Sequence, residues 1–188
     1  MKLKLKAGKL SCTNVFSNIN INAVEGKITV ISGRPGSGKS TLLSVLAGLI
    51  TPAGGSVTIN GRKISECPYN IGYIYDPVHI KENTKISHTP ISSGYDYNFV
   101  IINHKLETYG YISFNTNADK ASFLENDILN IVDILLIDDI FFGQSHYYSH
   151  DYYEALYRLV KKRKIICIPA VSYNNHIYNF SDKIIYLN

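Results

Sequence analysis

Residues 33–40, with the sequence GRPGSGKS, limit the fold of this 188-residue chain more than any other segment. They fit the pattern G-x-x-x-x-G-K-[ST] at every constrained position. Glycines in such a loop let successive backbone N–H groups turn inward and surround an anion, and the helix that follows adds the positive end of its dipole. The segment is therefore predicted to bind the phosphates of a nucleotide.

The flanking residues have the pattern that a phosphate-binding loop requires. Residues 27–31, KITVI, are rich in β-branched side chains and predict a strand. Residues 42–49 carry leucine and valine at helical spacing and predict a helix. Strand, glycine loop and helix in this order indicate an α/β fold of the P-loop NTPase class.

The side chains of the loop have expected roles at the nucleotide. Lys39 is expected to reach the β- and γ-phosphates, and the Ser40 hydroxyl to bind a Mg²⁺ ion that bridges them. Thr41 would add a hydroxyl near the α-phosphate. The residues expected to contact the nucleotide are Gly33, Arg34, Pro35, Gly36, Ser37, Gly38, Lys39, Ser40 and Thr41.

Composition indicates one globular α/β domain, since 45% of the residues are hydrophobic and the formal net charge is only +4. The lysines are scattered along the sequence except in residues 161–164, which are expected to form a solvated helix end. We therefore expect no nucleic-acid partner. Three distant cysteines predict neither a disulfide framework nor a zinc site. Without a signal peptide or a long apolar run, we expect any membrane-spanning component to be a separate chain.

Three further segments resemble the ATP-binding subunits of ABC transporters: residues 47–61, AGLITPAGGSVTING; residues 71–74, IGYI; and residues 134–139, ILLIDD, which are similar to a Walker B motif. The resemblance implies an ABC ATPase domain over residues 1–188, with a mixed sheet core and an N-terminal antiparallel β portion. It implies ATP and Mg²⁺ as cofactors. The implied partners are a membrane-spanning transporter subunit and a second nucleotide-binding subunit, identical or different. The implied location is peripheral, on the cytoplasmic face of a membrane, or on the matrix side if the protein is organelle-encoded.

Acidic residues at the ends of two predicted strands are the remaining site candidates. Asp138 ends an apolar strand at the carboxyl edge of the sheet, where its carboxylate is expected to orient the water around Mg²⁺. The resemblance implies that Asp139 replaces the family's catalytic glutamate and acts with Lys39, and that Asp76 replaces a glutamine and contacts the metal. Because Asp139 is one methylene shorter, and catalysis is sensitive to shifts of about 1 Å, we expect impaired hydrolysis.

Other segments depart from the family's pattern. Residues 114–118, FNTNA, align with the LSGGQ signature but lack both glycines, and Ser145 aligns with the aspartate loop. The switch histidine expected near residues 170–172 is absent, and His176 is close but misplaced. The loss of the signature puts the partner subunit's site in doubt and not the site of this chain, whereas the other departures point, like Asp139, to impaired hydrolysis.

The middle of the chain, about residues 77–130, covers the mostly helical subdomain of the family. Here residues 99–102 and 109–114 predict strands and residues 121–131 a short helix, so we expect this subdomain to be shortened or rebuilt. Beyond it, residues 151–162 predict a helix, and residues 164–168 and 183–187 predict strands. In the first part of the chain, strands are also predicted at residues 3–5, 15–21 and 71–75, and a hairpin turn is predicted at residues 60–61, Asn-Gly.

Two functions remain open at this point. The first is an ATP-driven transport subunit, which by its short length and by weak matches at residues 76–81 and 140–141 resembles the haem exporter of cytochrome c maturation. The second is a nucleotide-binding regulatory or structural subunit that does not hydrolyse ATP. A soluble ABC ATPase that acts on nucleic acid is disfavoured, because such proteins usually carry two cassettes.

Overall fold

The computed structural model describes residues 2–75, 97–104, 108–114, 127–138, 149–173 and 176–188. The described strands are β1 (Lys4–Cys12), β2 (Phe16–Val24), β3 (Lys27–Gly33), β4 (Gly54–Ile59), β5 (Arg62–Lys63), β6 (Ile71–Tyr75), β7 (Tyr97–Asn103), β8 (Thr108–Phe114), β9 (Ile134–Ile137), β10 (Ile166–Val171) and β11 (Lys183–Leu187). The described helices are α1 (Lys39–Leu46), α3 (Ser149–Arg163) and the 3₁₀ helices η1 (Ile64–Glu66), η3 (Asp127–Ile131) and η5 (His176–Phe180).

The first sheet is antiparallel, with the strand order β2-β1-β4-β5. In β1, buried Leu5 and Ala7 alternate with exposed Lys4 and Lys6, as expected for a sheet with one face on the core. The residues 60–61, Asn-Gly, join β4 to β5 with positive φ angles of 50° and 82°, which confirms the hairpin expected there.

The second sheet has seven strands in the order β11-β3-β10-β9-β6-β7-β8. The first five run parallel, and β7 and β8 add an antiparallel hairpin at one edge. The central strands β9 and β10 are buried along their whole length, which explains their continuous apolar sequences.

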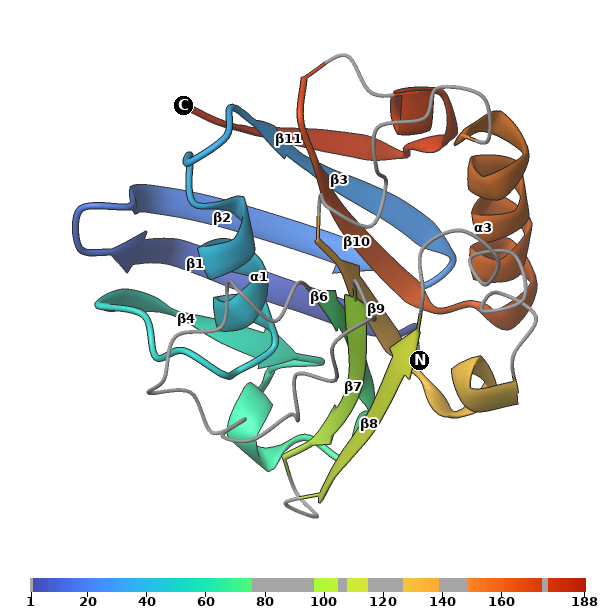
Figure 1. Cartoon of the computed structure of the whole chain (residues 1–188). Coiled ribbons are helices and arrows are strands. Elements are labelled where there is room, and N and C mark those ends of the chain that lie inside the picture. The colour runs from blue at the N-terminus through green and yellow to red at the C-terminus, as the bar shows by residue number, and fades with distance from the viewer. Residues whose placement is uncertain (1, 76–96, 105–107, 115–126, 139–148, 174–175) are drawn as a thin grey trace.

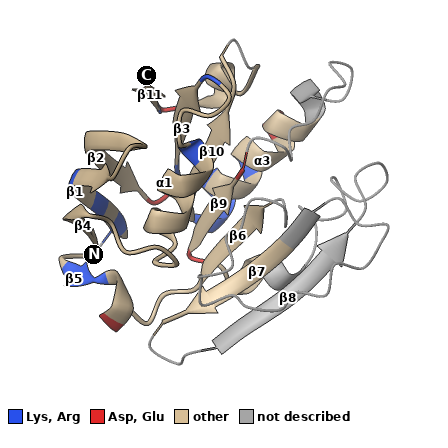
Figure 2. Ribbon diagram, turned by 60° about the vertical axis from the view of Figure 1, so that its left-hand side comes forward, with Lys and Arg blue, Asp and Glu red and all other residues tan. Residues whose placement is uncertain are grey.

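Helix α1 lies between the two sheets, and α3 covers the opposite face of the second sheet (Figures 1 and 2). The core around α1 joins Leu42 and Leu46 to Leu5 of the first sheet and Ile31 of the second. A second core joins α3 to the other face, with Tyr153, Leu156 and Val160 among its buried residues. The predicted phosphate-binding loop is therefore fixed at the start of a helix that is packed on both sides.

Several predicted elements are confirmed and others are shifted. The predicted strands at residues 99–102 and 109–114 lie in β7 and β8, the predicted helix at residues 151–162 lies in α3, and residues 183–187 form β11. The predicted short helix at residues 121–131 is a 3₁₀ helix over its last five residues, and residues 121–126 lie outside the described residues.

Two predicted boundaries were wrong for a local backbone reason. Strand β1 extends to Cys12 rather than ending near residue 5, because an irregularity at residues 8–9, where Lys9 has φ 52°, interrupts the alternation without ending the strand. Strand β10 begins at Ile166 rather than at residue 164, because Lys164 adopts φ 55° in the turn before it.

The β7–β8 hairpin contacts the end of α1. Nε2–H of His104, the residue after β7, donates a hydrogen bond of 2.7 Å to the carbonyl oxygen of Ala47, the C-cap of α1. This contact satisfies one of the carbonyl groups that a helix leaves without an internal partner. In the described part of the chain, no helix is long and apolar enough to span a bilayer.

Candidate nucleotide-binding site

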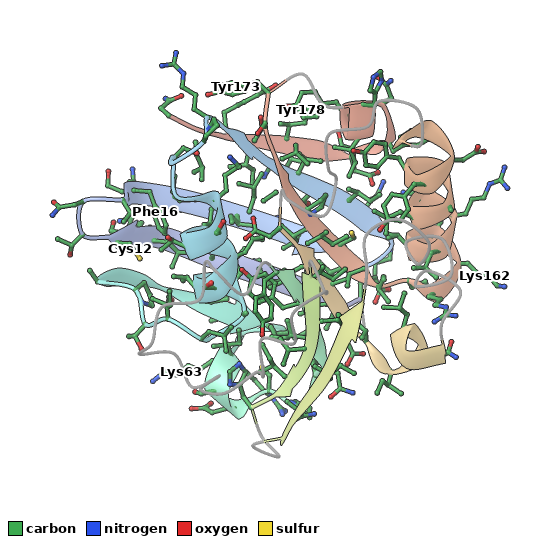
Figure 3. All side chains as sticks on the ribbon, viewed as in Figure 1. Cys12, Phe16, Lys63, Lys162, Tyr173 and Tyr178 are labelled. Carbon is green, nitrogen blue, oxygen red and sulfur yellow. The ribbon has the colours of Figure 1, made fainter. Side chains whose placement is uncertain are left out.

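The loop between β3 and α1 has the backbone conformation that its glycines predict. Gly36 and Gly38 adopt φ angles of 79° and 90°, in the region that favours glycine, and the Ser37 N–H donates to the Arg34 carbonyl at 3.1 Å. A Cβ atom on Gly38 would lie 2.4 Å from Cγ1 of Val15, in the β1–β2 turn. The first sheet therefore packs directly against the loop, and Figure 3 shows Cys12 and Phe16 at the same hairpin end.

Lys39 folds back over the loop that precedes it. Its side chain is 6% exposed, and Nζ donates hydrogen bonds of 3.0 Å to the carbonyl oxygens of Gly33 and Arg34. The ammonium group is thus held among the backbone groups of the loop, next to the N-terminal end of α1, where phosphate groups are favoured.

Ser40 and Asp138 meet although they are 98 residues apart in the sequence. The Ser40 hydroxyl donates a 3.0 Å hydrogen bond to Oδ1 of Asp138, which follows β9 and is 2% exposed. The backbone N–H of Asp138 donates to the Ile74 carbonyl at 2.9 Å, so the neighbouring strand β6 fixes its position. A hydroxyl and a carboxylate are hard oxygen donors, and this pair fits a Mg²⁺ ion that is also bound by phosphate and water.

Tyr73, in β6, contacts the first turns of α1 through its hydroxyl. Its hydroxyl lies 3.4 Å from the Ser44 hydroxyl and 3.5 Å from the Ser40 carbonyl oxygen. Burial, together with the nearby Asp138 carboxylate, raises the pKa of Tyr73 far above its usual range, so the phenol stays neutral. No signal in the sequence marks Tyr73 for this position, because an aromatic residue in a strand is usually a core residue.

Tyr178 connects the carboxyl ends of two strands beside the loop. Its hydroxyl forms a hydrogen bond with the hydroxyl of Ser32 in β3 and also lies 3.4 Å from the Ser172 carbonyl oxygen after β10. Figure 3 shows Tyr178 at this edge, with Tyr173 nearby. No signal in the sequence distinguished Tyr178 from the other tyrosines, because its position depends on the 3₁₀ helix η5.

The family follows from the sequence of the region that builds this site. Residues 16–139 match the model of the family described as ABC transporter, which is well over half of the chain. The chain belongs to the ABC transporter family. It is an ABC-type ATP-binding domain, and the predicted α/β P-loop fold with an antiparallel first sheet is confirmed.

Individual ABC proteins are similar to the whole chain. It is 24% identical to the protein named "Putative hemin import ATP-binding protein HrtA" of Staphylococcus saprophyticus, over 94% of this chain and 89% of that protein. Its fold resembles the "Putative ABC transporter (ATP-binding protein)" of Pyrococcus furiosus, with a TM-score of 0.64, 19% identity and coverage of 98% and 97% of the two chains. A dimeric ATP-binding cassette bound to ADP and Pi in a post-hydrolysis state also has a TM-score of 0.64, with 15% identity and coverage of 98% and 94%.

The ABC domain brings some of the predicted site residues together. Residues 33–41 form the loop and the first turn of α1, and Asp138 lies beside Ser40. His176 is exposed in η5. Asp76, Asp139, Ser145 and residues 115–118 lie outside the described residues.

Proposed function

We propose that this chain is the ATP-binding subunit of a transporter, with Mg²⁺-ATP bound at residues 33–41. The observation that carries the proposal is the hydrogen bond between Ser40 and Asp138. It brings together the phosphate-binding motif and the Walker B-like motif, which are distant in sequence. Ser40 and Asp138 would hold Mg²⁺ together with Asp76, whose role rests on the family resemblance alone. The metal, when bound, neutralises charge on the β- and γ-phosphates.

The residues of the loop would position the phosphates and stabilise their charge. The backbone N–H groups of the loop and the N-terminus of α1 favour an anion, and the Lys39 ammonium would exchange its carbonyl partners, Gly33 and Arg34, for phosphate oxygens. Asp139 would orient the attacking water from the position after Asp138. Its shorter side chain predicts slow hydrolysis.

The chain would work as part of a larger assembly. Two nucleotide-binding subunits, identical or different, would close over ATP and drive a separate membrane-spanning subunit from the cytoplasmic face. The family match and the dimeric cassette with ADP and Pi support this arrangement. We propose haem or a related compound as the cargo, and the name of the hemin import relative supports this. A more specific proposal is the haem exporter of cytochrome c maturation, which is supported only by short sequence matches.

A subunit that binds ATP without hydrolysing it is the second candidate. It is favoured by Asp139 in place of glutamate and by the missing glycines in residues 114–118. In that case ATP would stabilise an assembly, and the same loop and metal ligands would be used.

The experiment that separates the two candidates measures Mg²⁺-ATP binding and phosphate release on the purified protein, with any co-purifying membrane subunit retained. Lys39→Ala removes the phosphate-binding cation, and Lys162→Ala, on the exposed side of α3, is the matched control. Binding and turnover that are lost only in Lys39→Ala support the transport subunit. Binding without turnover, even with the partner present, refutes the motor and supports the second candidate, whereas no binding refutes both.

A further inference from the structure

Basic residues gather on the antiparallel sheet although the sequence spreads them along the chain. The four strands β1, β2, β4 and β5 contain no aspartate or glutamate. Their basic residues are Lys4, Lys6, Lys9, Arg62 and Lys63. Figure 2 shows the basic residues of β1 and β5 on one side of the molecule. Lysines that are scattered along the sequence therefore lie on one sheet in the fold.

The register of the sheet places lysines on its outward face. Lys6 lies opposite Asn22 on β2 and opposite Thr58 on β4, and Thr58 lies opposite Lys63 on β5. Lys4 is two residues from Lys6 on the same face, about 7 Å along the strand. Lys63 is two strands away from Lys6, which is about 10 Å.

A fourth lysine reaches this face from the second sheet. Lys183, the first residue of β11, lines a hollow of about 470 Å³ together with Lys6 and polar residues of β2 and β4. The polar lining residues are Asn20, Asn22, Ser56 and Thr58. We call Lys4, Lys6, Lys63 and Lys183 the basic face; all four are exposed.

Nearby carboxylates do not neutralise the basic face. Glu25 accepts a hydrogen bond from the Leu3 N–H, and Asp182 forms ion pairs with Lys27 and Lys161. Glu66, three residues after Lys63 in η1, is exposed and forms no ion pair with the described residues. Within the described residues, none of the four lysines of the basic face forms an ion pair. Their charges are therefore available to a partner.

We propose that the basic face docks on the anionic surface of a lipid bilayer. The inference rests on the proposed function, because a subunit that drives a membrane protein works beside such a surface. Ammonium groups on flexible stems over a flat sheet suit a diffuse negative surface, which needs no fixed geometry. The exposed positions of the four strands carry no aromatic ring on which a nucleic-acid base could stack. The one arginine of these strands, Arg62, is exposed on β5 opposite Ile59 and not in the row that joins Lys6, Thr58 and Lys63.

The strength of this docking should follow the number of lysines. Each lysine near an anionic surface raises the binding constant by about fivefold. The double variant Lys4→Gln/Lys6→Gln should therefore reduce vesicle binding by about 25-fold. Lys4→Arg/Lys6→Arg should retain it, because the charge is retained. A control that removes two positive charges from α3, Arg158→Gln/Lys162→Gln, should leave binding unchanged.

The test is co-sedimentation of the full chain with phosphatidylcholine vesicles, with and without phosphatidylserine, at low and high salt. Binding that requires phosphatidylserine, weakens with salt and is reduced only in Lys4→Gln/Lys6→Gln supports the proposal. Equal sedimentation of this variant and the wild type overturns it, provided that thermal unfolding shows both folded. Tighter binding of a single-stranded RNA oligonucleotide, lost in the same variant, also overturns it and assigns the face to nucleic acid.

Nucleotide binding in the same preparations keeps the two proposals apart. Mg²⁺-ATP binding without vesicle binding refutes the basic face as a lipid-docking surface and leaves the proposed function intact. Vesicle binding without Mg²⁺-ATP binding supports the basic face as a lipid-docking surface and refutes the proposed function.

Discussion

At the scale of single residues, Gly36 and Gly38 have similar φ angles but different surroundings. The two positions therefore show separately the effect of backbone strain and the effect of a steric clash. Both have positive φ angles, which an alanine adopts only with strain. Among the described residues other than its two chain neighbours, no heavy atom lies within 4 Å of a Cβ placed on Gly36, whereas a Cβ on Gly38 would meet Val15 at 2.4 Å. The loop thus needs glycine at position 38 for space as well as for conformation.

The first prediction compares these two positions. Gly36→Ala should lower the free energy of unfolding by about 1 kcal/mol, the cost of left-handed strain. Gly38→Ala should lower it by about 2–4 kcal/mol, because overpacking against Val15 adds to the strain. Denaturant unfolding of both variants measures the difference, and equal losses would show that the β1–β2 turn moves aside.

The second prediction concerns the acid after Asp138. Asp139→Glu should raise the rate of phosphate release by about 10- to 100-fold, because the longer side chain brings the carboxylate closer to the attacking water. Steady-state phosphate release measures this rate, with Lys39→Ala added to Asp139→Glu as the control that should abolish it. An unchanged rate would mean that the length of residue 139 does not limit hydrolysis.

At the scale of secondary structure, Asp182 links β3, α3 and β11. Its carboxylate accepts hydrogen bonds from Lys27 and the Ile28 N–H of β3 and from Lys161 of α3, and it precedes β11. Burial alone would raise the pKa of Asp182, but these hydrogen bonds and the Lys161 charge outweigh burial and hold the pKa below its ordinary value. The ionised form is therefore favoured by folding.

The third prediction is the pH dependence of that contribution. Because the pKa is lower in the folded state, the stabilisation is fully present above the ordinary carboxyl pKa of 3.8 and is lost as the pH falls through the folded-state value. Asp182→Asn should lower the melting temperature by about 2–4 °C near neutral pH, and the difference should disappear in acid.

Asp133 provides the control of opposite sign. Burial raises the pKa of Asp133 although the Asn70 N–H donates to its carboxylate, so its ionised form is disfavoured by folding. Asp133→Asn should therefore leave stability at neutral pH equal or higher. A loss as large as that of Asp182→Asn would contradict this electrostatic explanation.

The elements that the sequence predicted well are those with a strong local pattern. Clear local patterns predicted the positions of the P-loop, the apolar strand before Asp138 and the strand at residues 183–187. The extent of β1 was missed because the irregularity at Lys9 breaks the alternation. Tyr73 and Tyr178 reach the site only through tertiary contacts, and no local pattern marks such residues.

At the scale of the whole molecule, α1 is held between two sheets, and its N-terminus directly follows the glycine loop that is proposed to bind the nucleotide. A ligand bound at the loop should therefore stabilise the entire domain, because the loop, β3 and the β1–β2 turn pack as one unit.

The fourth prediction is the size of that stabilisation. Mg²⁺-ATP at about 100 times its dissociation constant should stabilise the fold by about 2.7 kcal/mol and raise the melting temperature by about 5–10 °C. Thermal unfolding with and without Mg²⁺-ATP measures the shift, which should disappear in Lys39→Ala and diminish when EDTA removes the metal. A full shift in Lys39→Ala would show that ATP binds elsewhere.

The position of β3 in the second sheet has a consequence for how the protein is made. The loop lies at residues 33–40, yet β3 pairs with β10 and β11, which contain residues 166–171 and 183–187. During synthesis the loop therefore leaves the ribosome long before its neighbouring strands exist. A nascent chain cannot complete the sheet around this loop until β10 and β11 have emerged, so ATP is expected to stabilise only molecules that have been translated past residue 187.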